Sequence, residues 1–362
     1  MGKRHSKQNS KQAKGQFFTS NVDYILYGYE DIVRGKDMID PFAGGKDLIS
    51  WSVDNGATSA IGYDIEPLFD DIIYNDSLMN PPSYVDKVLV SNPPYLSKNK
   101  CKVDKTVFSK WDANDYYKCH LQSLIVNGAE EAILIIPSNF LCEGRSKARA
   151  NLFKHYYAVK AKFWNEPTFE DATVGVCVLH MKLGTRQYQA FPLSIMPANI
   201  TIDVELLEKN GYLYGNDFYD YIRDITPIRI IKTDIGMTEP NTNIVVGLLD
   251  GGSWKCGISY NDKGPIYSKP KSFTTYQITT PDYNISIDNQ KLIVEIFNEK
   301  FDKFREQYYS MFLSNYMGAR QKILSRSYVH KFISRIIKDE LKLKKNEPIT
   351  NLTQFLFENK VK

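Results

Sequence analysis

The stretch Asp37-Met38-Ile39-Asp40-Pro41-Phe42-Ala43-Gly44-Gly45 decides the fold. Its first three residues are typical of the end of a short strand, and residues 48–55 that follow have a helical pattern. Glycines at such a strand-to-helix turn let the backbone approach a ligand closely. Free N–H groups at the start of the helix can meet a carboxylate or a phosphate. Taken alone, a D-P-x-x-G turn is often merely a tight loop, so the interpretation depends on the rest of the chain.

Strand and helix patterns alternate on both sides of this turn. Between residues 15 and 185, short apolar runs predict strands and amphipathic runs predict helices. The strands are expected at 37–39, 59–63, 87–91, 131–136, 159–163 and 174–181, and the helices at 48–55, 116–127 and 145–155. This alternation predicts an α/β fold in which helices cover both faces of a largely parallel, Rossmann-like sheet.

The rhythm changes after residue 186, where Gly and Asn become frequent, as in residues 249–265. Residues 290–345 have a helical and basic pattern, so this half is expected to be a separate, mixed α+β domain. We therefore predict a basic flexible tail at 1–14, a first domain at 15–190 and a second at 191–362.

The composition narrows the class of protein. Of the 362 residues, 43% are hydrophobic and 13% aromatic, which is ample for two folded cores. The five cysteines are scattered without a C-x-x-C pair, which predicts reduced thiols and no zinc site. No apolar run is long enough for a membrane span, and the N-terminus lacks the apolar stretch of a signal peptide. We expect a cytoplasmic protein with no metal and no membrane partner.

The charge is unevenly distributed. The net charge is +4, but residues 1–14 carry +5 and residues 301–362 carry +7, which leaves −8 for the middle of the chain. Basic ends suggest a polyanionic partner such as nucleic acid, although ordinary charge clustering would give a similar pattern.

Acidic residues follow the next two short segments. Asp64 and Ile65 come directly after the strand expected at 59–63, and Asp76 follows a third short segment. An acid at the end of the second strand can accept hydrogen bonds from ribose hydroxyls, and the apolar side chain after it can pack on an adenine ring. Each could be an ordinary acidic loop, but together with the glycine turn they outline a nucleoside pocket.

The most specific motif is Asn92-Pro93-Pro94-Tyr95, directly after an apolar strand. The prolines fix the backbone and remove its donors. The Asn92 amide oxygen and the Pro93 carbonyl can then both accept from one amino group, while Tyr95 offers a flat face to an aromatic ring. Gathering both hydrogens of a purine amine leaves its lone pair free to attack a methyl donor. A rigid turn with an exposed tyrosine would not explain the asparagine.

With these motifs the chain resembles the adenine-specific (N6) DNA methyltransferases, in the class that has an N-terminal G-Q-F-F-T segment, N-P-P-Y and a C-terminal target-recognition domain. The resemblance covers about residues 15–185. It includes Gly15-Gln16-Phe17-Phe18-Thr19-Ser20, the glycine turn and residues 131–137 and 169–174. The chain departs from the family at Ser20, where proline is usual, and at Lys46, where the turn usually has a third glycine.

The resemblance implies the roles of individual residues. The catalytic residues would be Asn92, Pro93, Pro94 and Tyr95, with Tyr95 and Phe169 stacking on the target base. The cofactor S-adenosyl-L-methionine would be held by Phe18, Thr19, Asp40, Pro41, Phe42, Gly44, Asp64, Ile65, Asp76 and Asn92. Residues 15–190 would then form the catalytic domain and residues 191–362 the DNA target-recognition domain.

The target amine lies inside stacked double-stranded DNA, so the resemblance also implies that the adenine is flipped out. Residues 314–322 and Arg326 combine amide, guanidinium and ammonium groups suited to bases and phosphates, although they could equally be a solvated basic helix face. The expected DNA-binding residues are Lys98, Asn315, Arg320, Lys322 and Arg326.

Other readings stay open. Methylation of adenine in ribosomal RNA, or of a protein glutamine amide, would use a similar motif, and a catalytically inactive DNA-binding module is a different class altogether. Cytosine amino-methyltransferases more often have Ser at the position of Asn92, and the absence of a Pro-Cys dipeptide excludes carbon-5 cytosine methylation. The implied context is restriction-modification, or an orphan or phage enzyme, and a cognate restriction endonuclease would be a separate protein.

Overall fold

The chain forms two compact units in the computed structural model, which describes Thr19 and residues 21–144, 146–169, 175–186, 188–233, 240–251, 255–266, 274–313, 316–318 and 321–346. The first unit comprises the chain up to Asn216 together with Met311–Lys322, and the second comprises Asp217–Ser310 and the chain from Ile323 onward. The expected tail at 1–14 and the site residues Phe18, Asn315 and Arg320 lie outside the described residues. The domain boundary expected at 190 stays a prediction.

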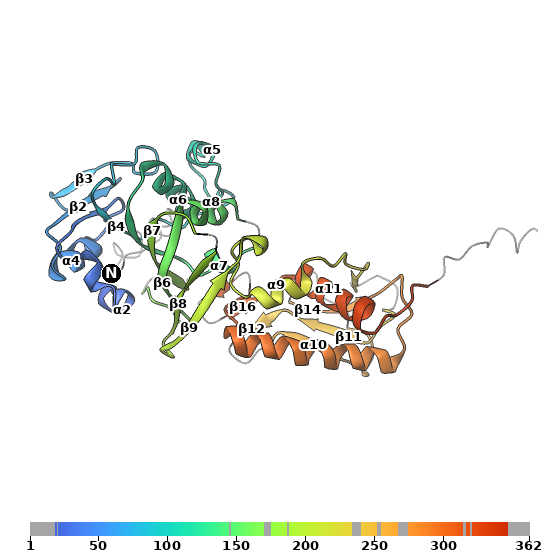
Figure 1. Cartoon of the computed structure of the whole chain (residues 1–362). Helices are drawn as coiled ribbons and strands as arrows, with labels where there is room; N and C mark the ends of the chain where they lie inside the picture. Colours follow the sequence, from blue (N-terminus) through green and yellow to red (C-terminus); the bar gives the residue numbers. More distant parts are fainter. Residues whose placement is uncertain are drawn as a thin grey trace, which may run out of the picture. The chain divides into compact units, whose positions relative to one another are not determined.

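A nine-stranded sheet is the centre of the first unit (Figure 1). Its order is β3-β2-β1-β4-β5-β7-β6-β8-β9. The strands are β1 (Asp37–Asp40), β2 (Ser59–Asp64), β3 (Ile72–Tyr74), β4 (Val88–Ser91), β5 (Glu131–Pro137), β6 (Tyr156–Trp164), β7 (Val176–Leu183), β8 (Gln189–Met196) and β9 (Ile200–Leu206).

The first five strands in this order are parallel, which confirms the Rossmann-like α/β fold. The other half is mixed, since β7 runs antiparallel between β5 and β6, and β9 is antiparallel to β8. The prediction of a largely parallel sheet therefore holds for one half of the sheet only. The chain returns from β8 to β9 through the short connection 197–199, which antiparallel neighbours permit.

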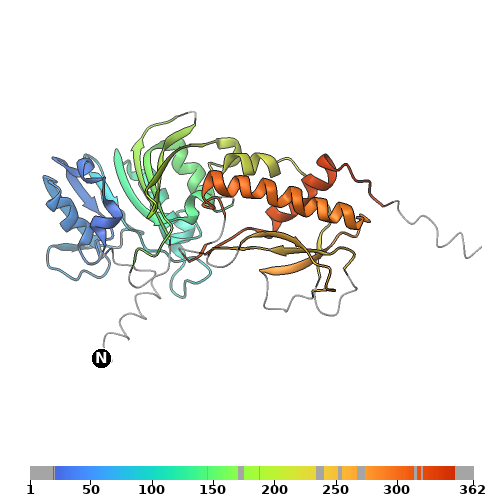
Figure 2. The same cartoon turned by 90° about the horizontal axis from the view of Figure 1, so that it is seen from below.

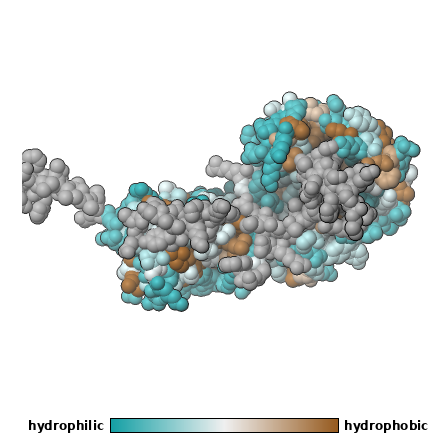
Figure 3. Space-filling model, turned by 180° about the vertical axis from the view of Figure 1, so that it is seen from behind, coloured by the Kyte–Doolittle hydropathy of each residue, from teal (hydrophilic) through white to brown (hydrophobic). Residues whose placement is uncertain are grey.

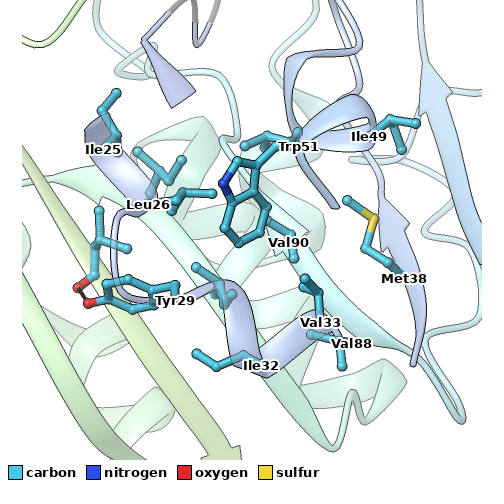
Figure 4. Packing of buried hydrophobic residues seen from close by; sticks show 14 of the residues in the cluster. Ile25, Leu26, Tyr29, Ile32, Val33, Met38, Ile49, Trp51, Val88 and Val90 are labelled. Carbon is cyan, nitrogen blue, oxygen red and sulfur yellow. Dashed lines mark hydrogen bonds between the residues drawn. The ribbon is translucent and has the colours of Figure 1, made fainter. Parts of the chain in front are cut away.

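Helices cover the sheet on both faces. The helices of the first unit are α2 (Val22–Leu26), α3 (Glu30–Val33), α4 (Asp47–Asp54), α5 (Thr106–Lys110), α6 (Tyr116–Asn127), α7 (Asn139–Cys142) and α8 (Lys147–His155). On one face, Ile25 and Trp51 from α2 and α4 pack against Met38, Val88 and Val90 of the strands (Figure 4). All of β4 and nearly all of β5 are buried, as expected of parallel strands covered on both sides.

One edge of the sheet gathers the loops that follow the strands. Because β1, β2, β4 and β5 are parallel, their carboxyl ends meet at this edge, and the antiparallel β7 begins there with Val176 opposite Pro137. The chain that leaves β6 after Trp164 lies at the same edge, because β6 is antiparallel to β7. We call this the carboxyl edge. Ligands of open α/β sheets bind at such an edge.

The second unit is an α+β structure. An antiparallel sheet has the order β10-β14-β11-β13, and its long helix α10 lies along one face (Figure 2). Phe297 and Phe301 of α10 pack with Phe218 and Phe332 into an aromatic core. The elements are α9 (Asn216–Ile222), β10 (Ile231–Lys232), β11 (Ile244–Gly247), β12 (Leu249–Asp250), β13 (Gly257–Tyr260), β14 (Thr275–Thr279), α10 (Ile287–Tyr308), α11 (Arg326–Arg335) and a π-helix (Ile336–Glu340).

The prediction that residues 290–345 are helical is partly wrong. Between α10 and α11 the chain forms two strands, β15 (Tyr316–Gly318) and β16 (Gln321–Ile323), which pair antiparallel with Tyr316 opposite Lys322. Gly318 disfavours a helix interior and suits a tight reversal of the chain.

The surface of the described residues shows no sign of a membrane span. None of the helices described is long and apolar enough to cross a bilayer. The face drawn in Figure 3 is mostly hydrophilic, with hydrophobic residues scattered among the polar ones. Isolated surface hydrophobics of this kind are normal in globular proteins.

Candidate active site

The glycine turn after β1 holds a buried carboxylate. Asp40 is 1% exposed, and its Oδ1 accepts a hydrogen bond from the Phe42 N–H at 2.9 Å. Its Oδ2 is buried and has no hydrogen-bond partner among the described residues. The pKa of Asp40 is raised to about 8, mainly by burial and also by the nearby carboxylates of Asp64 and Asp47, against the effect of the Phe42 hydrogen bond. The turn thus presents a carboxyl oxygen suited to a cationic or donor group.

The second half of the turn contains Lys46, a lysine with an unusual left-handed backbone. Gly44 and Lys46 both have left-handed backbones, with φ of 47° and 68°. Glycine adopts this conformation readily, whereas a lysine loses about 1 kcal/mol there. The Lys46 ammonium forms an ion pair with Asp71 at 2.5 Å and lies 5.3 Å from the centre of the Phe69 ring. Lys46 therefore adopts a left-handed backbone of the kind that glycine adopts readily, while its side chain bonds to Asp71 in the loop after β2.

Asp64 joins the turns that follow β1 and β2. Its Oδ2 accepts from the Gly44 N–H at 2.9 Å and its Oδ1 accepts from the Glu66 N–H at 2.8 Å. Packing favours glycine at position 62, two residues earlier, because a Cβ there would lie 2.9 Å from the Ala43 Cβ, which cannot move without its backbone. The neighbouring Ile65 side chain is 46% exposed and so offers an apolar surface beside the carboxylate.

Asp76 closes the loop after β3. One of its oxygens, Oδ1, accepts from the backbone N–H groups of Leu78 and Met79 at 3.2 and 3.1 Å. This local capping geometry fixes the carboxylate at the carboxyl edge, where the ends of β2 and β3 lie side by side. The three acidic positions predicted from the sequence therefore all lie at this edge, where Asp40 and Asp64 end β1 and β2 and Asp76 lies in the loop after β3.

A pocket opens beside the glycine turn. It is lined by Thr19, Asp40, Phe42, Ala43, Gly44, Gly45, Asp47, Leu48 and Asn92. The structure thus brings together Thr19, Asp40, Phe42, Gly44 and Asn92 of the expected cofactor residues, while Pro41, Asp64, Ile65 and Asp76 are not among the residues that line it. Across the described residues, no group of three or more His, Cys, Asp or Glu side chains is arranged to hold a metal ion.

Sequence reasoning missed Asp47 in this pocket. Asp47 is the first residue of α4, and burial raises the pKa of its carboxyl, opposed by hydrogen bonds from its own and the Thr19 N–H. An acid in the first turn of a helix is common because it complements the helix dipole, so its type alone carries no functional signal. Its place three residues after Gly44 could have suggested the pocket.

The Asn92 side chain is held by two partners. Its Nδ2 donates to the Thr19 Oγ1 at 3.0 Å, and its Oδ1 accepts from the Tyr95 hydroxyl at 2.6 Å. These bonds fix which way the amide faces. The Tyr95 hydroxyl also lies 2.8 Å from the Ile135 carbonyl, and burial raises the pKa of Tyr95 well above its usual value, so it stays a neutral donor. A carboxamide oxygen has two acceptor positions, which makes the Asn92 Oδ1 an acceptor of the kind that suits an amine.

The other residues of the N-P-P-Y motif differ in how far they are buried. Pro93 is buried, whereas Pro94 and Tyr95 are half-buried. The Tyr95 ring packs edge-on to Tyr117 with ring centres 6.1 Å apart. Phe169 comes from the β6–β7 loop, is 5% exposed and belongs to the same apolar cluster against which Tyr95 packs.

The described residues of the expected DNA-binding set differ in exposure. Lys98 in the first unit and Arg326 in the second are exposed, and Arg326 begins α11. Lys322 is 4% exposed, and its Nζ donates to the Asn165 Oδ1 at 2.7 Å. A buried ammonium bonded within the first unit is poorly placed for contact with a phosphate.

A buried histidine lies under the glycine turn. The His120 ring is 4.9 Å from the Phe42 ring, is fully buried, and its nitrogens have no partner among the described residues. Burial lowers the pKa of His120 to about 3. The unfolded chain takes up this proton near pH 6.5, so folding stability is lost as the pH falls from 6.5 toward 3, by about 2 kcal/mol at pH 5.

We therefore expect His120→Leu to lessen the loss of stability between pH 7.5 and pH 5. Urea unfolding at both values measures the free energy of unfolding, with the exposed His155→Leu as the matched control. The loss should be about 2 kcal/mol smaller in His120→Leu than in the wild type and unchanged in His155→Leu. Equal losses in all three proteins would show that His120 accepts its proton in the folded state.

Comparison with known proteins gives distant likenesses. No family model matches the chain, and no curated protein matches it. A nuclease-deletion mutant of the type ISP restriction-modification enzyme LlaGI, solved with a DNA substrate mimic, has a TM-score of 0.42 and 10% identity, over 64% of this chain and 34% of that one. The type I restriction-modification methyltransferase subunit from Streptococcus thermophilus has a TM-score of 0.36 and 14% identity, over 50% and 48%.

The M protein of the type I restriction enzyme EcoKI is similar to the same degree, with a TM-score of 0.36 and 16% identity over 52% of this chain and 50% of that one. The chain thus spans half or less of the length of these three proteins. With identities this low and TM-scores below 0.5, function has to be argued from the site itself.

Proposed function

We propose that the protein is a site-specific DNA methyltransferase that transfers a methyl group from S-adenosyl-L-methionine to the N6 amino group of a flipped-out adenine in double-stranded DNA. The observation that carries this proposal is the Asn92 carboxamide. It is held by Thr19 and Tyr95 and borders the same pocket as the buried Asp40 carboxyl. An amine acceptor and an acidic pocket side by side suit a target amine and a cationic methyl donor.

The residues of the pocket fit the cofactor. S-adenosyl-L-methionine would supply the methyl group, whose bond to sulfur breaks as its bond to nitrogen forms, so that the sulfur leaves as a neutral thioether. Its ammonium and sulfonium groups are both cationic. The buried Oδ2 of Asp40, which has no partner among the described residues, would accept from the ammonium, and Asp47 adds a second carboxyl to the pocket. By resemblance, Phe18, Pro41 and Phe42 would complete this part, and Asp64, Ile65 and Asp76 would hold the adenosine.

The pKa of Asp40 makes cofactor affinity depend on pH. The free protein holds a proton on Asp40 up to about pH 8, and a bound cation favours the ionised carboxylate. We expect the dissociation constant for the cofactor to fall up to about tenfold between pH 6.5 and pH 8.5, with a proton released on binding. Calorimetry in buffers of different ionisation enthalpy measures both quantities.

Asp40→Asn should remove this pH dependence and weaken binding at pH 8.5, and Asp54→Asn at the far end of α4 is the matched control. A pH dependence that survives in Asp40→Asn would assign the proton to another group.

The Asn92 Oδ1 and the Pro93 carbonyl would each accept a hydrogen bond from the target amine. After methylation, the amine loses one proton to solvent. Extruding a base from the duplex costs a few kcal/mol. Stacking on Tyr95, with Phe169 on the other side, would offset it by about 1–3 kcal/mol per contact. Rate enhancement would come from positioning and from the fixed dipoles around the amine, with no metal or covalent nucleophile.

Catalysis and recognition of the target sequence would be carried out by different domains. Residues 15–190 would form the catalytic domain and residues 191–362 the target-recognition domain. Lys98, Asn315, Arg320 and Arg326 would contact DNA, and the basic tail would add salt-dependent phosphate contacts. The expected context is restriction-modification, with any cognate endonuclease as a separate protein.

Purified protein incubated with labelled S-adenosylmethionine and matched double-stranded DNA, RNA and protein substrates tests this function. Mass spectrometry of the products should find N6-methyladenine in DNA at levels far above those in RNA. Label in RNA adenine or in a glutamine amide instead, with DNA unmodified, would establish the alternative reaction and reject the DNA proposal.

A further inference from the structure

A segment of the C-terminal half of the chain belongs to the first unit. Met311–Lys322 is part of that unit, although α10 before it and α11 after it belong to the second. We call Met311–Lys322 the return segment. Its residues Met311, Phe312 and Leu313 are at most 1% exposed, and Lys322 at its other end is 4% exposed. The described ends of the segment are therefore packed into the unit that carries the candidate active site.

Both ends of the return segment are bonded to loops at the carboxyl edge. The Met311 carbonyl accepts from the Cys142 Sγ, and the Lys322 Nζ donates to the Asn165 Oδ1 at 2.7 Å. Cys142 ends α7, which follows β5, and Asn165 directly follows β6. The segment thus reaches the edge that also holds Asn92 and Tyr95.

The loop that begins at Asn165 leads to Phe169. The Asn165 N–H donates to the Met196 carbonyl at 2.8 Å, and the Tyr24 hydroxyl donates to the Glu166 Oε1 at 2.5 Å. The Asn21 Nδ2 donates to the Thr168 carbonyl at 3.2 Å. Phe169 then enters the apolar cluster against which Tyr95 packs. Residues 165–169 are therefore fixed by contacts from several parts of the chain, and Lys322 contributes one of them from the C-terminal half.

We propose that Lys322 is a positioning residue, which holds the loop 165–169 through Asn165 and so sets the Phe169 ring for the target base. This proposal rests on the proposed function for its role in catalysis. It assigns Lys322 to the active site and not to the DNA backbone, which its charge alone would have suggested. Since the ammonium is buried, it would act on the base through the loop it holds and not by direct contact with DNA.

The test compares Lys322→Met, Asn165→Leu and the double variant, with Lys154→Met, at an exposed lysine of α8 just before β6, as the matched control. At saturating DNA and cofactor, each single variant should lower kcat about tenfold, and the double variant should be no worse than either. Hydrogen exchange of the amides at 165–169 should quicken in all three, while the dissociation constant for S-adenosylmethionine stays within twofold. Lys322→Arg keeps a donor and should recover part of the rate.

Salt separates the two roles of a lysine. A lysine that contacts phosphate reduces the slope of log K against log salt by about one when it is removed. We expect this reduction for Lys98→Met and not for Lys322→Met. A reduced slope in Lys322→Met, with hydrogen exchange at 165–169 as in the wild type, would overturn the positioning role, and so would additive losses in the double variant.

Hydrogen exchange needs no methylation, so it keeps the two proposals apart. If the wild-type protein leaves DNA unmodified, the proposed function fails, but hydrogen exchange still tests the contact. Faster exchange at 165–169 in Lys322→Met than in the wild type would show that Lys322 holds the loop, and unchanged exchange would show that it does not. If Lys322→Met does not fold, Asn165→Leu removes the same contact from the other side and decides the question in its place.

Discussion

Asn92→Ala is expected to lower the rate of methyl transfer about 10³-fold, equivalent to about 4 kcal/mol of transition-state stabilisation. The substitution removes the carboxamide that would accept from the target amine, together with its bonds to Thr19 and Tyr95. Single-turnover kinetics with preformed enzyme–DNA complex measures the chemical step alone. The loss should appear in kcat, because the acceptor acts on the reacting amine.

Asn127→Ala is the matched control for this variant. Asn127 ends α6, and its Nδ2 donates to the Ser123 carbonyl at 2.8 Å at the edge opposite the site, just before β5. The same loss of a carboxamide there should leave the rate within about twofold of the wild type. A rate for Asn92→Ala within tenfold of the wild type would contradict the assignment of Asn92 to the reacting amine.

Arg149→Met is expected to lower the free energy of unfolding of the first unit by about 4 kcal/mol. The Arg149 side chain is 1% exposed, and its guanidinium donates to the carbonyls of Phe140, Glu143, Gly144 and Gly211 at 2.7–2.8 Å. Methionine fills a similar volume but leaves these buried acceptors without donors, each at a cost of about 1–3 kcal/mol before relaxation.

Differential scanning calorimetry should show the midpoint of this unit lowered by roughly 10 °C. Arg149→Lys keeps one donor group but not the planar fork, so its midpoint should lie between those of the wild type and Arg149→Met. Arg34→Met is the matched control, because the Arg34 side chain is 66% exposed and pairs with an exposed Asp31. A midpoint for Arg149→Met within 2 °C of the wild type would show that the guanidinium is dispensable.

Much of the first half of the site could be predicted from the sequence, because its residues act through local backbone geometry. The glycine turn follows β1, Asp64 ends β2 and the motif at Asn92 follows β4, and parallel strands bring these positions to one edge. The left-handed backbone at Lys46 is a conformation that glycine adopts readily, and glycine is the residue that the resemblance leads one to expect at this position.

What the sequence could not supply depends on contacts between distant residues. Lys322 and Asn165 lie 157 positions apart, and no pattern of charge or periodicity couples them. The strands β8 and β9 and the hairpin of β15 and β16 were likewise absent from the prediction, because short strands with mixed polarity resemble loops or helix ends. Asp47 was overlooked because its residue type is ordinary at the start of a helix.

The most direct test of the central claim is methylation-aware single-molecule sequencing of DNA from cells that express this chain, with Asn92→Ala as the control. We expect one short sequence motif that carries N6-methyladenine in the wild-type sample and none in the control. Unmodified DNA, from cells in which the wild-type protein is folded and binds S-adenosylmethionine, would contradict it.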